Sequence, residues 1–132
     1  MNYKYVIDAY AWIEYFSASS QGKAAKRYIE SGESATPAIV LAELADKYER
    51  EHWPHLEEDL KFIKKAGLII DLDEGIALSA GKSKNKLKKR ANGFGMVDAI
   101  ILATALAANA KIVTGDEHFR GFKEAIMIKQ KI

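Results

Sequence analysis

The sequence predicts an α/β domain with a mostly parallel central sheet of about four or five strands. Short apolar runs typical of buried strands alternate with longer segments whose apolar residues recur at helical spacing. Parallel strands need crossover connections, and the intervening helical segments supply them. A third observation concerns function: four isolated acidic residues each stand where an apolar segment ends or begins, and these are Asp8, Glu43, Asp98 and Asp116.

The predicted strands are short. They cover residues 3–7, 34–36, 68–70, 111–114 and 125–128. Between them the sequence predicts helices around Trp12, over about 21–31, from Pro37 onward, after Pro54, over 73–91 and over 96–109, with a break at 92–95. Thr36 is expected to cap the third helix, with Pro37 at its first position, which places Glu43 about two turns in.

Length and composition limit the class of protein. The chain has 132 residues, which fits one domain over 1–132. It contains no cysteine, which excludes a disulfide framework and a thiolate zinc site and fits a cytoplasmic protein. Lysine and aspartate interrupt the N-terminus before a signal peptide can form, and no uncharged apolar run reaches the roughly 20 residues of a membrane span. We therefore expect no membrane association.

The acidic residues are expected to meet at one edge of the sheet. Asp8 and Asp116 directly follow predicted strands, and ligands of parallel sheets collect beyond the carboxyl ends of strands. Asp98 begins the helix that leads into the strand before Asp116. Carboxylates brought together without cations repel one another, so such a cluster indicates a divalent metal. Oxygen ligands suit Mg²⁺ or Mn²⁺ better than zinc, which indicates chemistry on phosphates.

Each carboxylate also has a purely structural interpretation. Asp8 is able to cap the following helix, and Glu43 to lie on a helix surface. Asp98 is favoured in a first helical turn by the macrodipole, although it heads an otherwise apolar face. Asp116 follows glycine, a common turn signal. The conjunction of all four is more specific than any one of them.

The chain resembles the PIN-domain nucleases, and closely the ribonuclease toxins of VapC type. Four blocks carry the resemblance, in the order of the family and across nearly the whole chain: Val6-Ile7-Asp8 with Trp12 to Phe16, Glu43-Leu44, Asp98 to Ala105, and Val113-Thr114-Gly115-Asp116 with Phe119. The resemblance implies a three-layer α/β/α fold. One departure is visible, because the family commonly has Ser or Thr after the first aspartate and this chain has Ala9.

The resemblance also implies roles for the site residues. The catalytic acids would be Asp8, Glu43, Asp98 and Asp116, with Asp8 and Asp98 as direct metal ligands. Thr114 would supply a hydroxyl near the substrate, and Glu43 or Asp116 would orient the attacking water. The implied activity is Mg²⁺- or Mn²⁺-dependent hydrolysis of RNA by an endoribonuclease with no other cofactor. The implied partners are a cognate antitoxin lying across the acidic pocket and a second copy of the chain in a homodimer.

A basic run offers a surface for RNA. Six of the nine residues from Lys82 to Arg90 are basic, although the net charge of the whole chain is only +2. Such a run is often just the solvated face of a helix. Beside four carboxylates it would help a polyanion to approach, so Lys84, Lys86, Lys88 and Lys89 are candidate RNA contacts. His118 lies two residues from Asp116 and is a weaker candidate.

Other functions compete with a toxin nuclease. A housekeeping RNA-processing nuclease would need the same site. Phosphatases and phospho-acceptor domains also place acids and Mg²⁺ at a sheet edge, but Asp8 has no acidic neighbour at position 7 or 10. A non-catalytic RNA-binding or scaffold domain would gain nothing from four repelling carboxylates. Trp12 and its aromatic neighbours indicate a core or a dimer surface more than base stacking.

Overall fold

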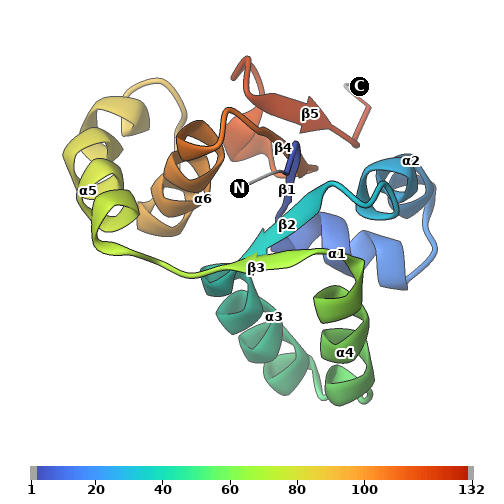
Figure 1. Ribbon diagram of the computed structural model, residues 1–132. Helices are drawn as coiled ribbons and strands as arrows, with labels where there is room; N and C mark the ends of the chain where they lie inside the picture. Colours follow the sequence, from blue (N-terminus) through green and yellow to red (C-terminus); the bar gives the residue numbers. More distant parts are fainter. Residues whose placement is uncertain (1–2, 131–132) are drawn as a thin grey trace.

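The chain folds around a five-stranded, all-parallel sheet, as seen in a computed structural model that describes residues 3–130 (Figure 1). The strand order is β3-β2-β1-β4-β5, and every neighbouring pair is parallel. The strands are β1 (Tyr5–Ile7), β2 (Ser34–Pro37), β3 (Leu68–Ile70), β4 (Lys111–Thr114) and β5 (Ala125–Met127). This sheet confirms the predicted α/β class and the predicted strand segments, with ends that differ by one or two residues.

Helices connect all strands except β4 and β5, which are joined by a short 3₁₀ helix. Within residues 3–130 the α-helices are α1 (Ala9–Phe16), α2 (Ser20–Ile29), α3 (Ala38–Glu51), α4 (Leu56–Ala66), α5 (Glu74–Lys88) and α6 (Met96–Ala107). The 3₁₀ helix η1 covers Glu117–Phe119 and has no counterpart among the elements predicted from the sequence. No helix in this range is long and apolar enough to cross a bilayer.

The path of the chain reverses direction between β1 and β4. From β1 it steps through β2 to β3 at one edge, then returns past β1 to β4 and β5 on the other side. Because crossovers between parallel strands are right-handed, this reversal sends the connecting helices to opposite faces of the sheet. Figure 1 shows α5 and α6 on one side and α1 to α4 on the other, a three-layer arrangement. The crevice at such a reversal point is where open α/β sheets bind ligands.

The two strands that flank this reversal lie in the core. Val6 and Ile7 of β1 and Ile112 and Val113 of β4 are fully buried. Helix α6 lies between the sheet and α5, so every residue from Ala99 to Ala105 is buried. Packing on both sides explains why α6 is apolar all round. Asp98, at its first turn, is therefore held by a rigid element against β1 and β4.

The predicted start of α3 is wrong in one detail. Pro37 ends β2 and stands at the N-cap, and α3 begins at Ala38, without a side-chain cap. The Thr36 hydroxyl does not cap the helix, because it accepts a hydrogen bond from the indole nitrogen of buried Trp12 at 3.0 Å. A buried indole N–H needs a partner, and this demand takes precedence over the local capping pattern. Glu43 still falls in the second turn of α3.

Candidate metal centre

Asp8 lies at the carboxyl end of β1, where it begins α1. Its Oδ1 accepts the backbone N–H of Ala11 at 2.9 Å, so it caps the helix as the local interpretation requires. It is also buried, with 4% of the residue exposed. Burial raises the pKa of Asp8 to about 7, against the opposing effect of the hydrogen bonds from Thr114 and Ala11. Capping the helix therefore does not keep Asp8 away from the other acids, because its carboxyl group interacts with the charges of Asp116 and Glu43.

Thr114 joins the ends of β1 and β4. Its fully buried hydroxyl donates a short hydrogen bond to Asp8 Oδ2 and accepts the backbone N–H of Asp116 at 2.9 Å. Gly115 allows this tight connection, because any side chain there would overlap the Tyr10 ring, only 2.2 Å from the position of a Cβ. The sequence assigned Thr114 to the substrate. In the structure its hydroxyl lies between two carboxylate-bearing segments, and the predicted contact with substrate stays a prediction.

Asp98 approaches from α6. Its Oδ2 accepts the backbone N–H of Gly95 at 2.9 Å, which satisfies the otherwise free N-terminus of the helix. Only 14% of the side chain is exposed. Burial raises the pKa of Asp98, while the Gly95 N–H and the imidazole of His118 act in the opposite direction. The carboxylate is thus fixed on one oxygen by backbone and side-chain donors.

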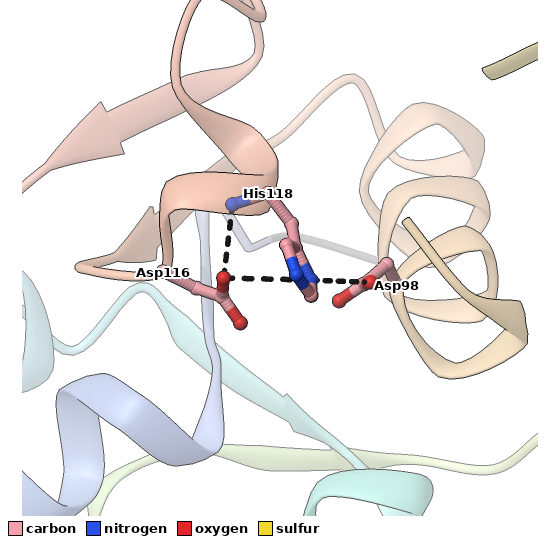
Figure 2. Close-up of side chains that lie close together, drawn as sticks. All are labelled: Asp98, Asp116 and His118. Atoms are coloured by element: carbon pink, nitrogen blue, oxygen red, sulfur yellow. Dashed lines mark hydrogen bonds and ion pairs between the residues drawn. The ribbon is translucent and has the colours of Figure 1, made fainter. Parts of the chain in front are cut away.

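His118 lies between Asp98 and Asp116, as Figure 2 shows. Its Nδ1 is 2.9 Å from Asp98 Oδ2 and 3.5 Å from Asp116 Oδ1. Asp116 caps η1, because its Oδ1 also accepts the backbone N–H of His118 at 2.9 Å. The 3₁₀ turn therefore places the imidazole back over the aspartate that begins it. One ligand atom from each of the three residues falls within 4.8 Å of the others, which is compact enough for a single metal ion.

Glu43 extends the acidic cluster from the second turn of α3. Its pKa is raised to about 7, first by burial and then by the negative charges of Asp98 and Asp116. The structure thus brings all four predicted acids into one electrostatic neighbourhood at the carboxyl end of the sheet. Without a cation, the carboxylates of this cluster repel one another.

The donor set fits a hard divalent cation. Asp98 Oδ2 and Asp116 Oδ1 are engaged by N–H donors, while the second oxygen of each has no donor among residues 3–130. The group that is compact enough for one ion contains Asp98, one of the two predicted ligands, but not Asp8. The two oxygens of Asp8 accept hydrogen bonds from Ala11 and Thr114. Carboxylate oxygens are the ligands that Mg²⁺ and Mn²⁺ accept.

The predicted basic run lies on and just beyond α5. Lys86, Lys88 and Lys89 are exposed and Lys84 is half-buried. Because α5 and α6 pack together and are joined by only seven residues, the basic end of α5 lies near the start of α6. The run is therefore on the same side of the molecule as Asp98. None of these lysines forms an ion pair with the acids of the cluster.

Sequence reasoning underrated two residues of the centre. His118 was a weak candidate for substrate contact, and the structure places it between two acids. Gly93 was interpreted only as part of a break, but it has a φ of +85°, and a Cβ there would lie 2.8 Å from His118 Nε2. The spacing Asp116-x-His118 after a strand was the available signal. The role of His118 depends on η1. This 3₁₀ helix has only three residues and no periodic pattern, so the sequence does not predict it.

Carboxylates gathered at the reversal point of an α/β sheet form a site able to hold a metal ion and act on phosphates. Comparison of the sequence with protein families identifies the PIN domain over residues 5–125. The chain therefore belongs to the PIN-domain family, as the sequence predicted. No curated protein sequence matches it at a significant level.

Solved structures share the same fold. A toxin-antitoxin complex from Klebsiella pneumoniae contains a chain with a TM-score of 0.75 and 21% identity, covering 97% of this chain and 100% of its own. DNA-bound VapBC from Salmonella typhimurium gives 0.71 and 17%, with coverage of 96% and 99%. The Mycobacterium tuberculosis toxin VapC20, described as cleaving the sarcin-ricin loop, gives 0.67 and 15%, with 92% and 98%. At these identities the likeness establishes the fold.

Proposed function

We propose that the protein is a Mg²⁺- or Mn²⁺-dependent endoribonuclease that acts as the toxin of a toxin-antitoxin pair. The observation that carries this proposal is the meeting of Asp8, Asp98 and Asp116, with Glu43 nearby, where the chain reverses direction in the sheet. Membership of the PIN-domain family and the fold shared with VapC toxins support it.

The chain's own residues divide the work of hydrolysis. The ion, when bound, would lower the pKa of a coordinated water and stabilise the charge that develops on the phosphate. Asp8, Asp98 and Asp116 would hold it, and Thr114 would fix the relative positions of Asp8 and Asp116 through its two hydrogen bonds. Glu43, facing the same charges from α3, would orient the attacking water. Lys84, Lys86, Lys88 and Lys89 would attract the RNA backbone.

The test of activity is RNA cleavage by purified protein with Mg²⁺ or Mn²⁺. Asp98→Asn and EDTA should each lower the cleavage rate by more than about a hundredfold, because each removes a contact made to the transition state through the metal. Asp73→Asn is the control, since exposed Asp73 is also an aspartate that accepts a backbone N–H at a helix N-terminus, with Oδ1 2.8 Å from the Ile76 nitrogen. Unchanged cleavage by Asp98→Asn would remove this mechanism.

An enzyme that hydrolyses cellular RNA in the cytoplasm needs restraint. We therefore propose a cognate antitoxin whose Arg or Lys reaches Asp8, Asp98 and Asp116 and competes with the metal. Co-expression with the neighbouring reading frame should yield a complex with reduced cleavage. If no adjacent small protein binds and overexpression leaves growth unchanged, a housekeeping RNA-processing nuclease becomes the better account.

A homodimer remains part of the proposal. Among the early aromatic residues, Trp12 is fully buried and belongs to the core, while Tyr15 and Phe16 are half-buried. Phe62 of α4 contacts all three rings and is 39% exposed, so it marks the outer surface of this aromatic group. A dimer formed through this surface should dissociate in Phe62→Ser, which size-exclusion chromatography with light scattering would detect.

A further inference from the structure

We propose that His118 is a positioning residue for the metal centre, which fixes Asp98 and Asp116 through an Nδ1–H shared by their carboxylates and does not bind the ion itself. This inference rests on the proposed function, because it names how one residue of this chain prepares the same site. It assigns a role that neither the acidic motif nor the fold requires.

The first step is the identity of the proton on the ring. His118 Nδ1 faces Asp98 Oδ2 at 2.9 Å and Asp116 Oδ1 at 3.5 Å. A bare nitrogen lone pair directed at two carboxylate oxygens would be repelled by both, whereas an N–H is attracted by both. Nδ1 therefore carries the proton, and a protonated nitrogen cannot coordinate a metal. The other ring nitrogen, Nε2, lies on the side of Gly93.

The second step is the count of donors on each oxygen. Asp98 Oδ2 receives the N–H of Gly95 as well as that of the imidazole, both at 2.9 Å. Asp116 Oδ1 receives the backbone N–H of His118 at 2.9 Å. One oxygen of each carboxylate is thus occupied by protein donors, Oδ2 in Asp98 and Oδ1 in Asp116. The other oxygen of each is left for the ion. Partners of this kind orient metal ligands, and their loss commonly lowers metal affinity by about tenfold or more.

The third step is the fixed orientation of the imidazole. Gly93 lies against the opposite edge of the ring, so closely that a Cβ there would be 2.8 Å from Nε2. The backbone N–H of His118 is held by Asp116, and this ties the residue to η1 from the other side. The ring is therefore held between Gly93 and the two carboxylates, with Nδ1 directed toward the acids.

The test compares three substitutions of the full chain by Mn²⁺ titration, in which electron paramagnetic resonance measures the free ion. His118→Asn keeps an N–H donor near the position of Nδ1, because the Asn side-chain amide nitrogen occupies the same branch from Cγ. His118→Gln places its amide near Nε2, and His118→Ala has no donor. We expect Mn²⁺ affinity to fall about tenfold in His118→Ala and His118→Gln and to recover in His118→Asn. A purely structural role would not distinguish Asn from Gln in this way.

Pulsed electron paramagnetic resonance supplies the second measurement. Mn²⁺ bound to the parent should show no coupling to a directly coordinated ¹⁴N nucleus. Such a coupling would make His118 a ligand and overturn the proposal. Equal Mn²⁺ affinity in the parent and the three variants would also overturn it. So would a Mn²⁺ affinity of His118→Asn no higher than that of His118→Gln. Cleavage of RNA separates the two hypotheses: Mn²⁺ binding without cleavage refutes the nuclease, and cleavage with unchanged affinity in His118→Ala refutes the positioning role. A parent protein that binds no Mn²⁺ would overturn both.

Discussion

Replacing the buried, ionisable Asp8 should change how the free energy of unfolding of the metal-free protein depends on pH. Burial raises the pKa of Asp8 from its ordinary 3.8 to about 7. Between these values the folded protein holds a proton that the unfolded chain has released, so stability must fall as the pH rises from about 4 to about 7. At about 1.4 kcal/mol for each tenfold change in acidity, the full effect is roughly 4 kcal/mol.

Asp8→Asn isolates this contribution. Asparagine remains neutral at every pH and, as a good N-cap residue, retains the acceptor for the Ala11 N–H. The metal-free variant should therefore match the parent near pH 4 and exceed it by up to roughly 4 kcal/mol at pH 8. Asp73→Asn changes the exposed cap of α5 and should follow the parent at both pH values.

The assay is urea unfolding of metal-stripped protein followed by circular dichroism across this pH range. Saturating Mn²⁺ should reverse the order at pH 8, because the ion binds the ionised carboxylates of the folded parent and stabilises it by mass action. Parallel pH profiles for the parent and Asp8→Asn would refute the reasoning, since they would mean that Asp8 ionises in the folded protein at no cost.

Three further outcomes follow from the same contacts. Thr114→Val keeps the shape of the side chain but leaves Asp8 Oδ2 and the Asp116 N–H without a partner, so urea unfolding should show a loss of about 1–3 kcal/mol. Mg²⁺ should raise the melting temperature of the parent more than that of Asp98→Asn, and equal shifts would exclude Asp98 as a ligand. Neutralising Lys84, Lys86, Lys88 and Lys89 should weaken RNA binding and flatten its dependence on salt concentration. Neutralising Lys61, Lys64 and Lys65 of α4 should do neither. If the salt dependence of binding is unaltered, the basic run is only a solvated surface.

The sequence contained enough information to locate the acids because their placement depends on local patterns. Ile112, Val113 and Thr114 are β-branched, and Lys111–Thr114 forms β4 with the predicted ends. Asp8 and Asp116 follow strands, and the carboxyl ends of parallel strands necessarily share an edge. The acids meet only if the strands that precede them are neighbours in the sheet. In a chain that alternates strands and helices, a reversal of direction between neighbouring strands is the usual arrangement, and it fulfils this condition.

What the sequence could not show are contacts between distant segments. The Thr36 hydroxyl is taken by Trp12, 24 residues away, and this contact overrides the helix-cap pattern. The Thr114 hydroxyl reaches Asp8 across 106 residues, a link between strands that the sequence did not predict. His118 acquires its role from a 3₁₀ turn and from a glycine 25 positions earlier. Each requires the folded arrangement before its chemistry can be recognised.

The contact between Gly93 and His118 leads to a final prediction. Gly93→Ala adds a methyl group 2.8 Å from Nε2, so the imidazole must move and its Nδ1–H must leave the two carboxylates. Gly32→Ala is the matched control, because Gly32 also has a positive φ, of +78°, but nothing lies within 4 Å of its Cβ position. Both substitutions should destabilise the fold by about 1–2 kcal/mol, the cost of a left-handed conformation for alanine. Only Gly93→Ala should also lower Mn²⁺ affinity, in the direction of His118→Ala, and calorimetric titration would measure this. If the two glycine variants bind Mn²⁺ equally well, the position of the imidazole does not govern the metal centre, and the carboxylates are held in place by their backbone donors alone.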